Sequence, residues 1–246
     1  MDRLIYTAVS GMADSMIRQG ALASNLANAQ TIGFRAETFD STPVALTSPT
    51  SLGARTMVTT GVLGADMSAG SIVETGRTLD IAMQGEVMLA VQVADGSEAY
   101  TRRGDLSVSP SGALVNGDGR PVIGSGGPIT VPPGAEISIG PDGSVLMADP
   151  AMPDQPPQVV DRVKLANWQG SQIVKGTDGL FRVRDGGVLP ADEEARVQVG
   201  ALEQSNVDIT RILVEMVQAQ RLFDMRTKLV ATAKELDEGG ASLMRI

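Results

Sequence analysis

The stretch SNLANAQTIGFR, residues 24–35, decides how the N-terminal part of this chain folds. Asparagine side chains such as those of Asn25 and Asn28 can cap helix carbonyls and turn the chain. Gly33 permits a backbone conformation that other residues resist. Because an amphipathic run leads into this stretch, we predict that a long helix over residues 2–27 ends here.

The distribution of proline predicts a second long helix at the other end of the chain. All 13 prolines lie between Pro43 and Pro190. Since proline in a helix interior costs about 3 kcal/mol, proline-free ends are what two long helices require. The second helix follows the stretch GALEQSNVDI, residues 200–209. At 1.5 Å per residue the two helices would be about 40 and 45 Å long.

The first predicted helix carries an apolar stripe of modest width that is rich in small residues. Seven-residue spacing gives two rows on one face, which are Ile5, Met12, Gln19 and Leu26, and Ala8, Ser15 and Leu22. The residues that flank these rows are Val9, Met16 and Ala23. Such a face needs a partner, which can be another part of the chain or another copy.

The second predicted helix has a wider apolar face. Its first row is Ile209, Met216, Phe223 and Val230, and its second is Ile212, Ala219 and Ala233. Four leucines widen the face, namely Leu213, Leu222, Leu229 and Leu236, and Arg226 interrupts it. Since neither helix is followed by a helical neighbour in the sequence, the two must pair with each other, with other copies, or with both.

The middle of the chain is predicted to be β structure. Short apolar or alternating runs occur at 87–94, 105–109, 136–140, 144–148 and 159–168, and Gly-containing turn dipeptides separate several of them. Residues 38–69 are rich in Thr, Ser and Gly and indicate an extended linker with edge strands.

These patterns predict an α+β fold, in which the long terminal helices pair as a coiled-coil-like domain and a mainly-β domain is inserted between them. The inserted domain is expected to be antiparallel and sandwich- or barrel-like. We place the helical domain at 1–35 and 203–246, the linker region at 36–80 and 185–202, and the β domain at 81–184.

The amino-acid composition excludes several classes of functional site. The chain has no cysteine and no histidine, which removes disulfides, thiolate metal sites and the commonest general base. Most of the net charge of −9 lies in the middle of the chain, which argues against nucleic acid as a partner. No apolar stretch approaches the roughly 18 residues that span a bilayer. The N-terminus also lacks the continuous apolar segment of a secretory signal, so we expect a cytoplasmic protein or export without a cleaved signal.

Motifs that could carry chemistry are weak. Residues 116–119, NGDG, superficially resemble a calcium loop but lack its alternating oxygen ligands, so a hairpin turn is favoured. The glycine-rich run at 124–127 is followed by Pro128 rather than by a helix, which disfavours phosphate binding. We therefore predict no catalytic residue, no metal site and no cofactor. An enzyme that acts on peptidoglycan and a secreted adhesin remain as alternative classes.

Four motifs in a fixed order resemble the flagellar rod and hook family, the axial proteins of the bacterial flagellum. They are residues 24–35, 70–91 (GSIVETGRTLDIAMQGEVMLAV), 100–124 (YTRRGDLSVSPSGALVNGDGRPVIG) and 202–221, which opens LEQSNV. The chain departs from the family pattern at 87–89 and at Leu106, where Phe is usual. The opening MDRLIYTA and the closing LMRI look most like a proximal-rod member, with a distal-rod member as the alternative.

The resemblance implies a structural subunit that assembles into a helical tube, which transmits torque and surrounds the export channel. The implied partners are other copies of the chain, proximal and distal rod neighbours and the flagellar type III export apparatus, with no nucleic acid and no small-molecule substrate. The implied location is the periplasm-spanning rod of the basal body. We expect the assembly interface to comprise Ile5, Ala8, Met12, Met16, Leu22, Asn25, Leu26, Asn28, Gly33, Phe34, Leu202, Ser205, Asn206, Val207, Ile209, Ile212, Met216, Ala219, Phe223 and Val230.

Overall fold

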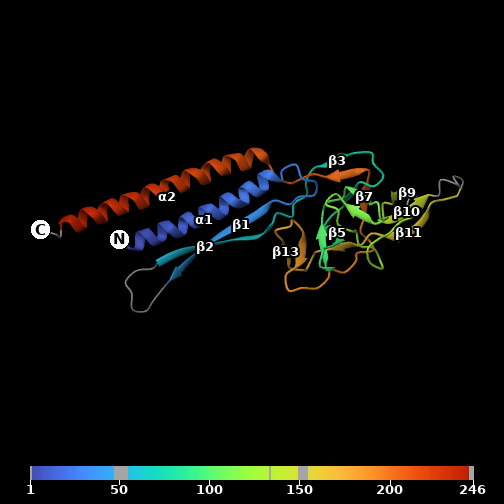
Figure 1. The fold of residues 1–246 in the computed structure, drawn as a ribbon, viewed down its shortest axis with the longest axis horizontal. Helices are drawn as coiled ribbons and strands as arrows, with labels where there is room; N and C mark the ends of the chain where they lie inside the picture. The colour runs from blue at the N-terminus through green and yellow to red at the C-terminus, as the bar shows by residue number, and fades with distance from the viewer. Residues whose placement is uncertain (1, 47–54, 133, 149–154, 244–246) are drawn as a thin grey trace. The chain divides into compact units, whose positions relative to one another are not determined.

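The computed structural model describes residues 2–46, 55–132, 134–148 and 155–243, with the backbone alone for 2–7, 40–46, 55–63, 237 and 240–243 (Figure 1). The chain divides into two compact units. The first, here the helical unit, comprises Met1–Ala29, Ala36–Asp66 and Val207–Ile246. The second, here the β unit, comprises Gln30–Arg35 and Met67–Asn206.

The helical unit contains α1 (Asp2–Ala27) and α2 (Ile209–Leu243), so the two predicted helices are confirmed. α1 ends where asparagine can satisfy its last carbonyls, because Asn28 Nδ2 donates to Ser24 O over 2.9 Å. α2 begins after an N-cap, since Asp208 Oδ1 accepts from the backbone N–H groups of Thr210 and Arg211. Neither helix is apolar enough over a sufficient length, within its described residues, to cross a membrane.

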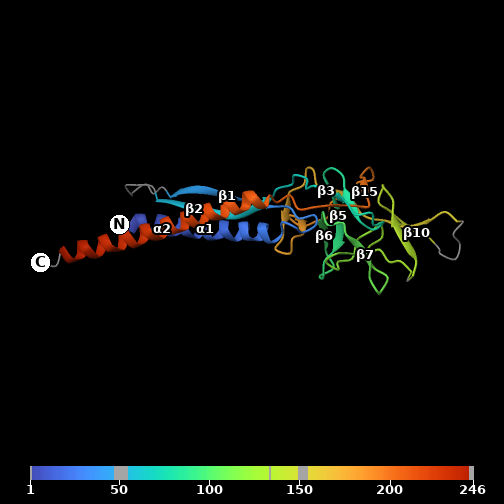
Figure 2. The same ribbon diagram turned by 90° about the horizontal axis from the view of Figure 1, so that it is seen from above.

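The two helices lie side by side (Figures 1 and 2). Leu22 of α1 is fully buried and packs in one cluster with Ile212 and Ala219 of α2. Further along, Arg226 of α2 donates hydrogen bonds to Gly11 O and Ser15 Oγ of α1. The contact between the helices is therefore apolar at one end and polar near its middle.

A long antiparallel hairpin packs against α1 within the same unit. It consists of β1 (Glu37–Leu46) and β2 (Arg55–Ala65). Asn25 fastens the hairpin to the helix, since its Nδ2 donates to Glu37 O over 3.0 Å and its Oδ1 accepts from Glu37 N over 2.7 Å. The guanidinium of Arg18 lies 4.8 Å from the centroid of the Phe39 ring, which adds a cation–π contact.

The β unit is built from small antiparallel sheets. The largest has the strand order β12-β5-β6-β14-β13, from β5 (Val87–Gln92), β6 (Glu98–Thr101), β12 (Leu165–Asn167), β13 (Ile173–Lys175) and β14 (Phe181–Val183). A three-stranded sheet has the order β11-β10-β9, from β9 (Glu136–Ile139), β10 (Ser144–Ala148) and β11 (Gln158–Arg162).

Three two-stranded pairs complete the β unit. They are β4 (Ile81–Met83) with β15 (Val197–Val199), β3 (Ile72–Glu74) with β16 (Ala201–Glu203), and β7 (Leu106–Val108) with β8 (Leu114–Asn116). One continuous apolar core lies beneath them, and among its fully buried members are Ile81, Leu89, Val91, Leu106, Leu114, Val122 and Val145.

The predicted fold class needs correction, although α+β itself is compatible with the structure. In the part of the chain that the structure describes, the β strands form no closed barrel, so the sandwich- or barrel-like expectation was wrong. Most strands of the β unit are only three to six residues long, and tight turns interrupt the ladders before they can close. The expected coiled-coil-like pairing of the helices is not found either. A coiled coil requires a continuous apolar seam, whereas Arg226, Gly11 and Ser15 meet in a polar contact.

Candidate assembly surfaces

Helix α2 exposes a surface of large apolar side chains. Leu236 is 60% exposed, Met225 and Val214 are each 54% exposed, and Leu229 is 52% exposed. The set, here the apolar surface of α2, is Leu213, Val214, Val217, Leu222, Met225, Leu229 and Leu236. A monomeric soluble protein rarely leaves such a run of apolar side chains in water, so this surface is a candidate for contact with a partner.

Helix α1 also exposes apolar residues, on the side away from its buried positions. Met16 is 62% exposed, and Val9 and Ile17 are exposed as well. Ala8, Ser15 and Leu22, which follow one another at seven-residue intervals, are instead buried. One of the two heptad rows predicted for α1 thus faces the interior of the helical unit. The flanking residues Val9 and Met16 are exposed instead.

The structure distributes the predicted interface residues of the helical unit over three environments. The buried ones are Ala8, Leu22, Asn25, Ile212 and Ala219. The half-buried ones are Met12, Leu26, Asn28, Val207, Met216, Phe223 and Val230, and the exposed ones are Met16 and Ile209. The side chain of Ile5 lies outside the described part of the chain. Apart from Ile209, the exposed large apolar residues of α2 therefore lie outside its predicted heptad rows. Four of them, Leu213, Leu222, Leu229 and Leu236, are the leucines predicted to widen the face.

The remaining predicted residues lie in the β unit, where the two signature stretches meet. Gly33 N donates to Glu203 O over 2.8 Å, and Asn206 N donates to Phe34 O over 3.3 Å. Gly33 has a φ of 68°, and a Cβ there would lie 2.3 Å from the carbonyl carbon of Arg102. Glycine is therefore required at this position for two reasons, the left-handed backbone and the close approach of another segment.

A buried cluster of charges joins the same stretches, and sequence patterns did not reveal it. Arg35 Nη2 lies 2.7 Å from Glu203 Oε1, and Arg102 Nε donates to Glu203 Oε2 over 2.8 Å. Gly70 N donates to the same carboxylate over 2.8 Å. All three charged side chains are at least 96% buried. The carboxylate of Glu203 therefore holds two guanidinium groups and a backbone N–H, which come from three other parts of the chain.

Arg102 connects this cluster to the neighbouring strands. Its guanidinium donates to the backbone carbonyls of Met83, Gly85 and Val87. Burial lowers the pKa of Arg102, and the charge of Glu203 acts in the opposite direction. Because the carboxylate and the carbonyls satisfy its donors, the guanidinium serves as a structural tie within the β unit.

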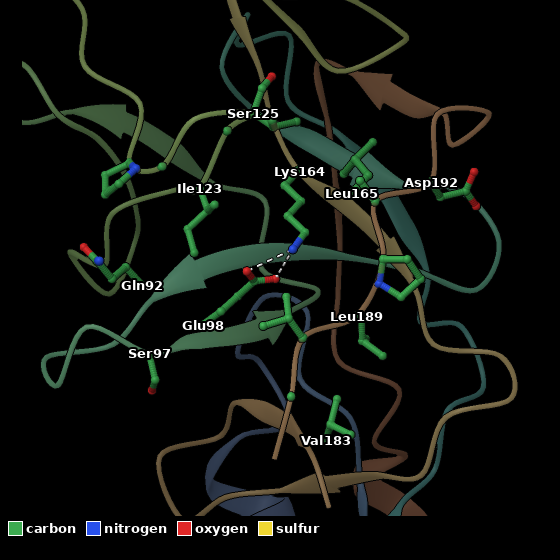
Figure 3. Close-up of a pocket in the computed structure, with 18 of the residues that line it drawn as sticks. Gln92, Ser97, Glu98, Ile123, Ser125, Lys164, Leu165, Val183, Leu189 and Asp192 are labelled. Carbon is green, nitrogen blue, oxygen red and sulfur yellow. Dashed lines mark hydrogen bonds and ion pairs between the residues drawn. The ribbon is translucent and has the colours of Figure 1, made fainter. Parts of the chain in front are cut away.

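The β unit also contains a groove of about 1230 Å³ (Figure 3). Lys164 Nζ lies 2.7 Å from a carboxylate oxygen of Glu98 in the groove, and aliphatic side chains such as Ile123, Leu165 and Leu189 surround this ion pair. Leu189 N donates to Tyr100 Oη, and burial raises the pKa of that phenol, which stays neutral. Within the described residues, no group of three or more acidic side chains is placed to hold a metal ion.

Comparison with known proteins identifies the family. Residues 5–35 match the model of the flagella basal body rod protein, residues 82–147 match the D1 domain of the flagellar hook proteins FlgE, FlgF and FlgG, and residues 198–243 match the C-terminal part of the rod proteins FlgE, FlgF and FlgG. The chain belongs to the flagellar basal-body rod protein family.

Named relatives narrow the position of the chain within this family. The chain is 42% identical to the flagellar basal-body rod protein FlgF of Salmonella typhimurium strain LT2, over 98% of each chain. It is also 42% identical to FlgF of Escherichia coli strain K12, over 96% of this chain and 95% of that one. FlgG of Bacillus subtilis strain 168 is 32% identical over the whole of both chains. The predicted family and the greater similarity to its FlgF-like members are confirmed.

Proposed function

We propose that this chain is a structural subunit of the proximal part of the flagellar rod, and that it assembles through the exposed apolar residues of its two long helices. The apolar surface of α2 is the observation that carries the proposal. Full burial of a Leu, Met or Val side chain contributes about 1.5–3 kcal/mol, so several such residues can offset the cost of association. Family membership supports assembly with other rod components.

In this proposal, some of the predicted interface residues hold the two helices of one chain together and others contact neighbouring subunits. Leu22, Ile212 and Ala219 hold α1 and α2 together within one chain. Met16 and Ile209 are exposed and available to neighbours without any rearrangement. In the proposed assembly, neighbouring copies pack side by side on these exposed faces. A heterologous contact of this kind that does not close produces a helical filament, as a rod requires.

The proposal extends to partners, location and organisation. The partners are other copies of the chain, proximal and distal rod neighbours and the type III export apparatus, and the location is the periplasm-spanning part of the basal body. The helices would surround the export channel as the axial domain, 1–35 and 203–246, with 81–184 outside and the remaining segments as linkers. The complete absence of cysteine is compatible with export in an unfolded state.

A structural role is favoured over the alternative of a peptidoglycan-acting enzyme. The relatives carry the name of rod proteins. Lys164 and Glu98, two of the charged residues that line the groove, already form an ion pair with each other. A subunit that transmits torque needs extended contacts rather than a reactive centre. We therefore assign no catalytic residue and no cofactor.

A substitution on α2 tests the proposal. Leu229→Asp places a charge within the apolar surface of α2, and Gln220→Asp, at an exposed polar position of the same helix, is the matched control. We expect Leu229→Asp to abolish swimming and the incorporation of the chain into isolated basal bodies, with the control close to the unsubstituted chain. Both purified variants should keep the circular dichroism of the original. Normal incorporation of Leu229→Asp would refute the role of this surface.

A further inference from the structure

The groove of the β unit opens where two neighbouring strands separate. β6 and β14 are paired through a single pair of residues, Tyr100 and Phe181. Continued antiparallel pairing would bring Glu98 opposite Val183, but the strands diverge and both residues line the groove instead (Figure 3). The groove therefore lies at an interrupted ladder, within a sheet that is continuous elsewhere.

The backbone of Glu98 points into this gap. Glu98 lies opposite Gln92 of β5, and Gln92 N donates away from β6, to Pro121 O over 2.8 Å. Gln92 and Glu98 are therefore a non-hydrogen-bonded pair, in which the two opposite residues direct their N–H and C=O groups away from each other. The peptide groups of Glu98 are consequently aimed at β14, where the described residues provide no ladder partner.

The lining of the groove favours an extended peptide. Among the described residues that line it, none has an aromatic ring of the kind that stacks on sugars. Arg162 and Lys164 flank the buried Val163 and both line the groove. Lys164 is neutralised by Glu98, whereas Arg162 donates to backbone carbonyls, those of Asp142 and Glu193. Among the described residues Arg162 forms no ion pair within 4.0 Å, although its charge acts on the carboxylate of Asp142. Its guanidinium can therefore also bind a carboxylate of a ligand.

Strand β3 has the complementary features. Ile72 is 50% exposed and Val73 is 47% exposed, although both are large and apolar. Ser71 O and Thr75 N bond toward β16, so the peptide groups of Ile72 and Glu74 face away from β16. On that side the described residues provide no further strand, so β3 is an edge strand. An exposed apolar edge of this kind is a template for another strand.

We propose that the groove of one copy receives strand β3 of a second copy as an added strand beside Glu98. The free peptide groups of Ile72 and Glu74 would complete the interrupted ladder, the apolar side chains would meet Ile123 and Leu189, and the carboxylate of Glu74 would bind Arg162. This inference rests on the proposed function, since it gives the assembling subunits a second contact in their β units. The groove and the edge are different surfaces, so the contact is heterologous and propagates along a filament.

Cross-linking tests the contact directly, because the chain contains no native cysteine. A full-length chain with Ile72→Cys is mixed with one that carries Ser97→Cys at the groove, and a short bismaleimide is added. The matched control replaces Ile72→Cys with Val159→Cys, which is 66% exposed on β11. We expect the first mixture to form heterodimers at least about fivefold more than the control. A chain that carries both cysteines should form a ladder of higher oligomers.

Reversal of the charges of Glu74 and Arg162 tests whether strand β3 is the segment that occupies the groove. Glu74→Arg alone and Arg162→Glu alone should each lower the cross-link yield by about fivefold or more, and the two together should restore it. Equal yields with the Val159→Cys control, or a double variant that stays as low as the single ones, would overturn the proposal. The proposal would also be overturned if a soluble cell-wall glycan protected Ser97→Cys from maleimide labelling while an excess of unlabelled chain did not. A chain that enters the basal body without this cross-link refutes the inference and leaves the proposed function intact.

Discussion

Arg35 and Glu203 form a buried ion pair, with Nη2 of the arginine 2.7 Å from Oε1 of the glutamate. The two residues come from the two signature stretches near opposite ends of the chain, and each is only 2% exposed. Arg102 binds the other oxygen of the same carboxylate. A single buried anion therefore joins the two signature stretches within the β unit. This dependence leads to the first prediction.

Replacement of Glu203 with Gln should destabilise the β unit strongly. The substitution keeps the size of the side chain but leaves two buried guanidinium groups without their counter-charge, for which we expect a loss of about 3–5 kcal/mol in the free energy of unfolding. Urea unfolding followed by the fluorescence of Trp168, the single tryptophan, would measure it. Glu74→Gln, at an exposed position, is the control and should change little. An unchanged urea midpoint for Glu203→Gln would contradict the structural role of the cluster.

A comparison of Gly33 with Gly76 separates two causes of the requirement for glycine at residue 33, the close approach of Arg102 and the left-handed backbone. Gly33 and Gly76 have φ angles of 68° and 73°, but a Cβ on Gly33 would meet the backbone of Arg102 whereas one on Gly76 would meet nothing within 4 Å. Gly76→Ala should therefore cost about 1–2 kcal/mol, from the left-handed conformation alone. Gly33→Ala should cost several kcal/mol more, measured by the same urea titration. Equal losses would argue that Arg102 does not lie against Gly33.

The polar contact at Arg226 should control how firmly α1 is held. Arg226→Ala removes the hydrogen bonds to Gly11 O and Ser15 Oγ, worth about 1–3 kcal/mol when one partner is charged. Amide hydrogen exchange in α1 should accelerate by about tenfold or more, with the β unit unaffected. Arg221→Ala, at an exposed position of α2, should leave exchange in α1 unchanged. Equal acceleration by both variants would show that the contact is not specific.

Ile212→Asp and Leu229→Asp should fail in different ways. Ile212 is buried against Leu22 within the helical unit, so an aspartate there should cost about 3 kcal/mol or more and reduce the helix content of the purified chain. Leu229 is exposed, so its replacement should reduce assembly without loss of helix. Circular dichroism together with the recovery of basal bodies would distinguish the two. A fully helical Ile212→Asp chain would contradict the packing of α1 on α2.

Acid should weaken the turn between β13 and β14. Hydrogen bonds from Arg182 lower the pKa of Asp178, against the opposing effect of burial. The unfolded chain therefore binds the proton more readily than the folded one, so the contribution of Asp178 is complete above about pH 4 and is lost as the pH falls through its lower folded pKa. Asp178→Asn should show a smaller loss of stability between pH 5 and pH 2 than the original chain. An identical acid profile would exclude this contribution.

The features that could be predicted from sequence are those with a local or periodic cause. Both ends of the chain lack proline, and asparagine occurs in residues 24–35. These two features were sufficient to predict the positions of α1 and α2. The hairpin of β1 and β2 was less evident, because its Thr- and Gly-rich strands lack clear alternation and indicate linker as readily as ladder. Arg226 was noted as an interruption of the apolar face, but its partners Gly11 and Ser15 are distant in sequence. The same holds for Glu203, since no periodicity connects it with Arg35 or Arg102.

The bond from Gly33 N to Glu203 O has a consequence for the order in which the chain can fold. A polypeptide that emerges N-terminus first presents Gly33 early, but Glu203 arrives only after nearly all of the β unit. Contacts between such distant residues form slowly, because a long loop must close first. The N-terminal segment therefore cannot complete its contacts until the C-terminal one is present, so the last part of the chain to be synthesised is the part that completes the fold.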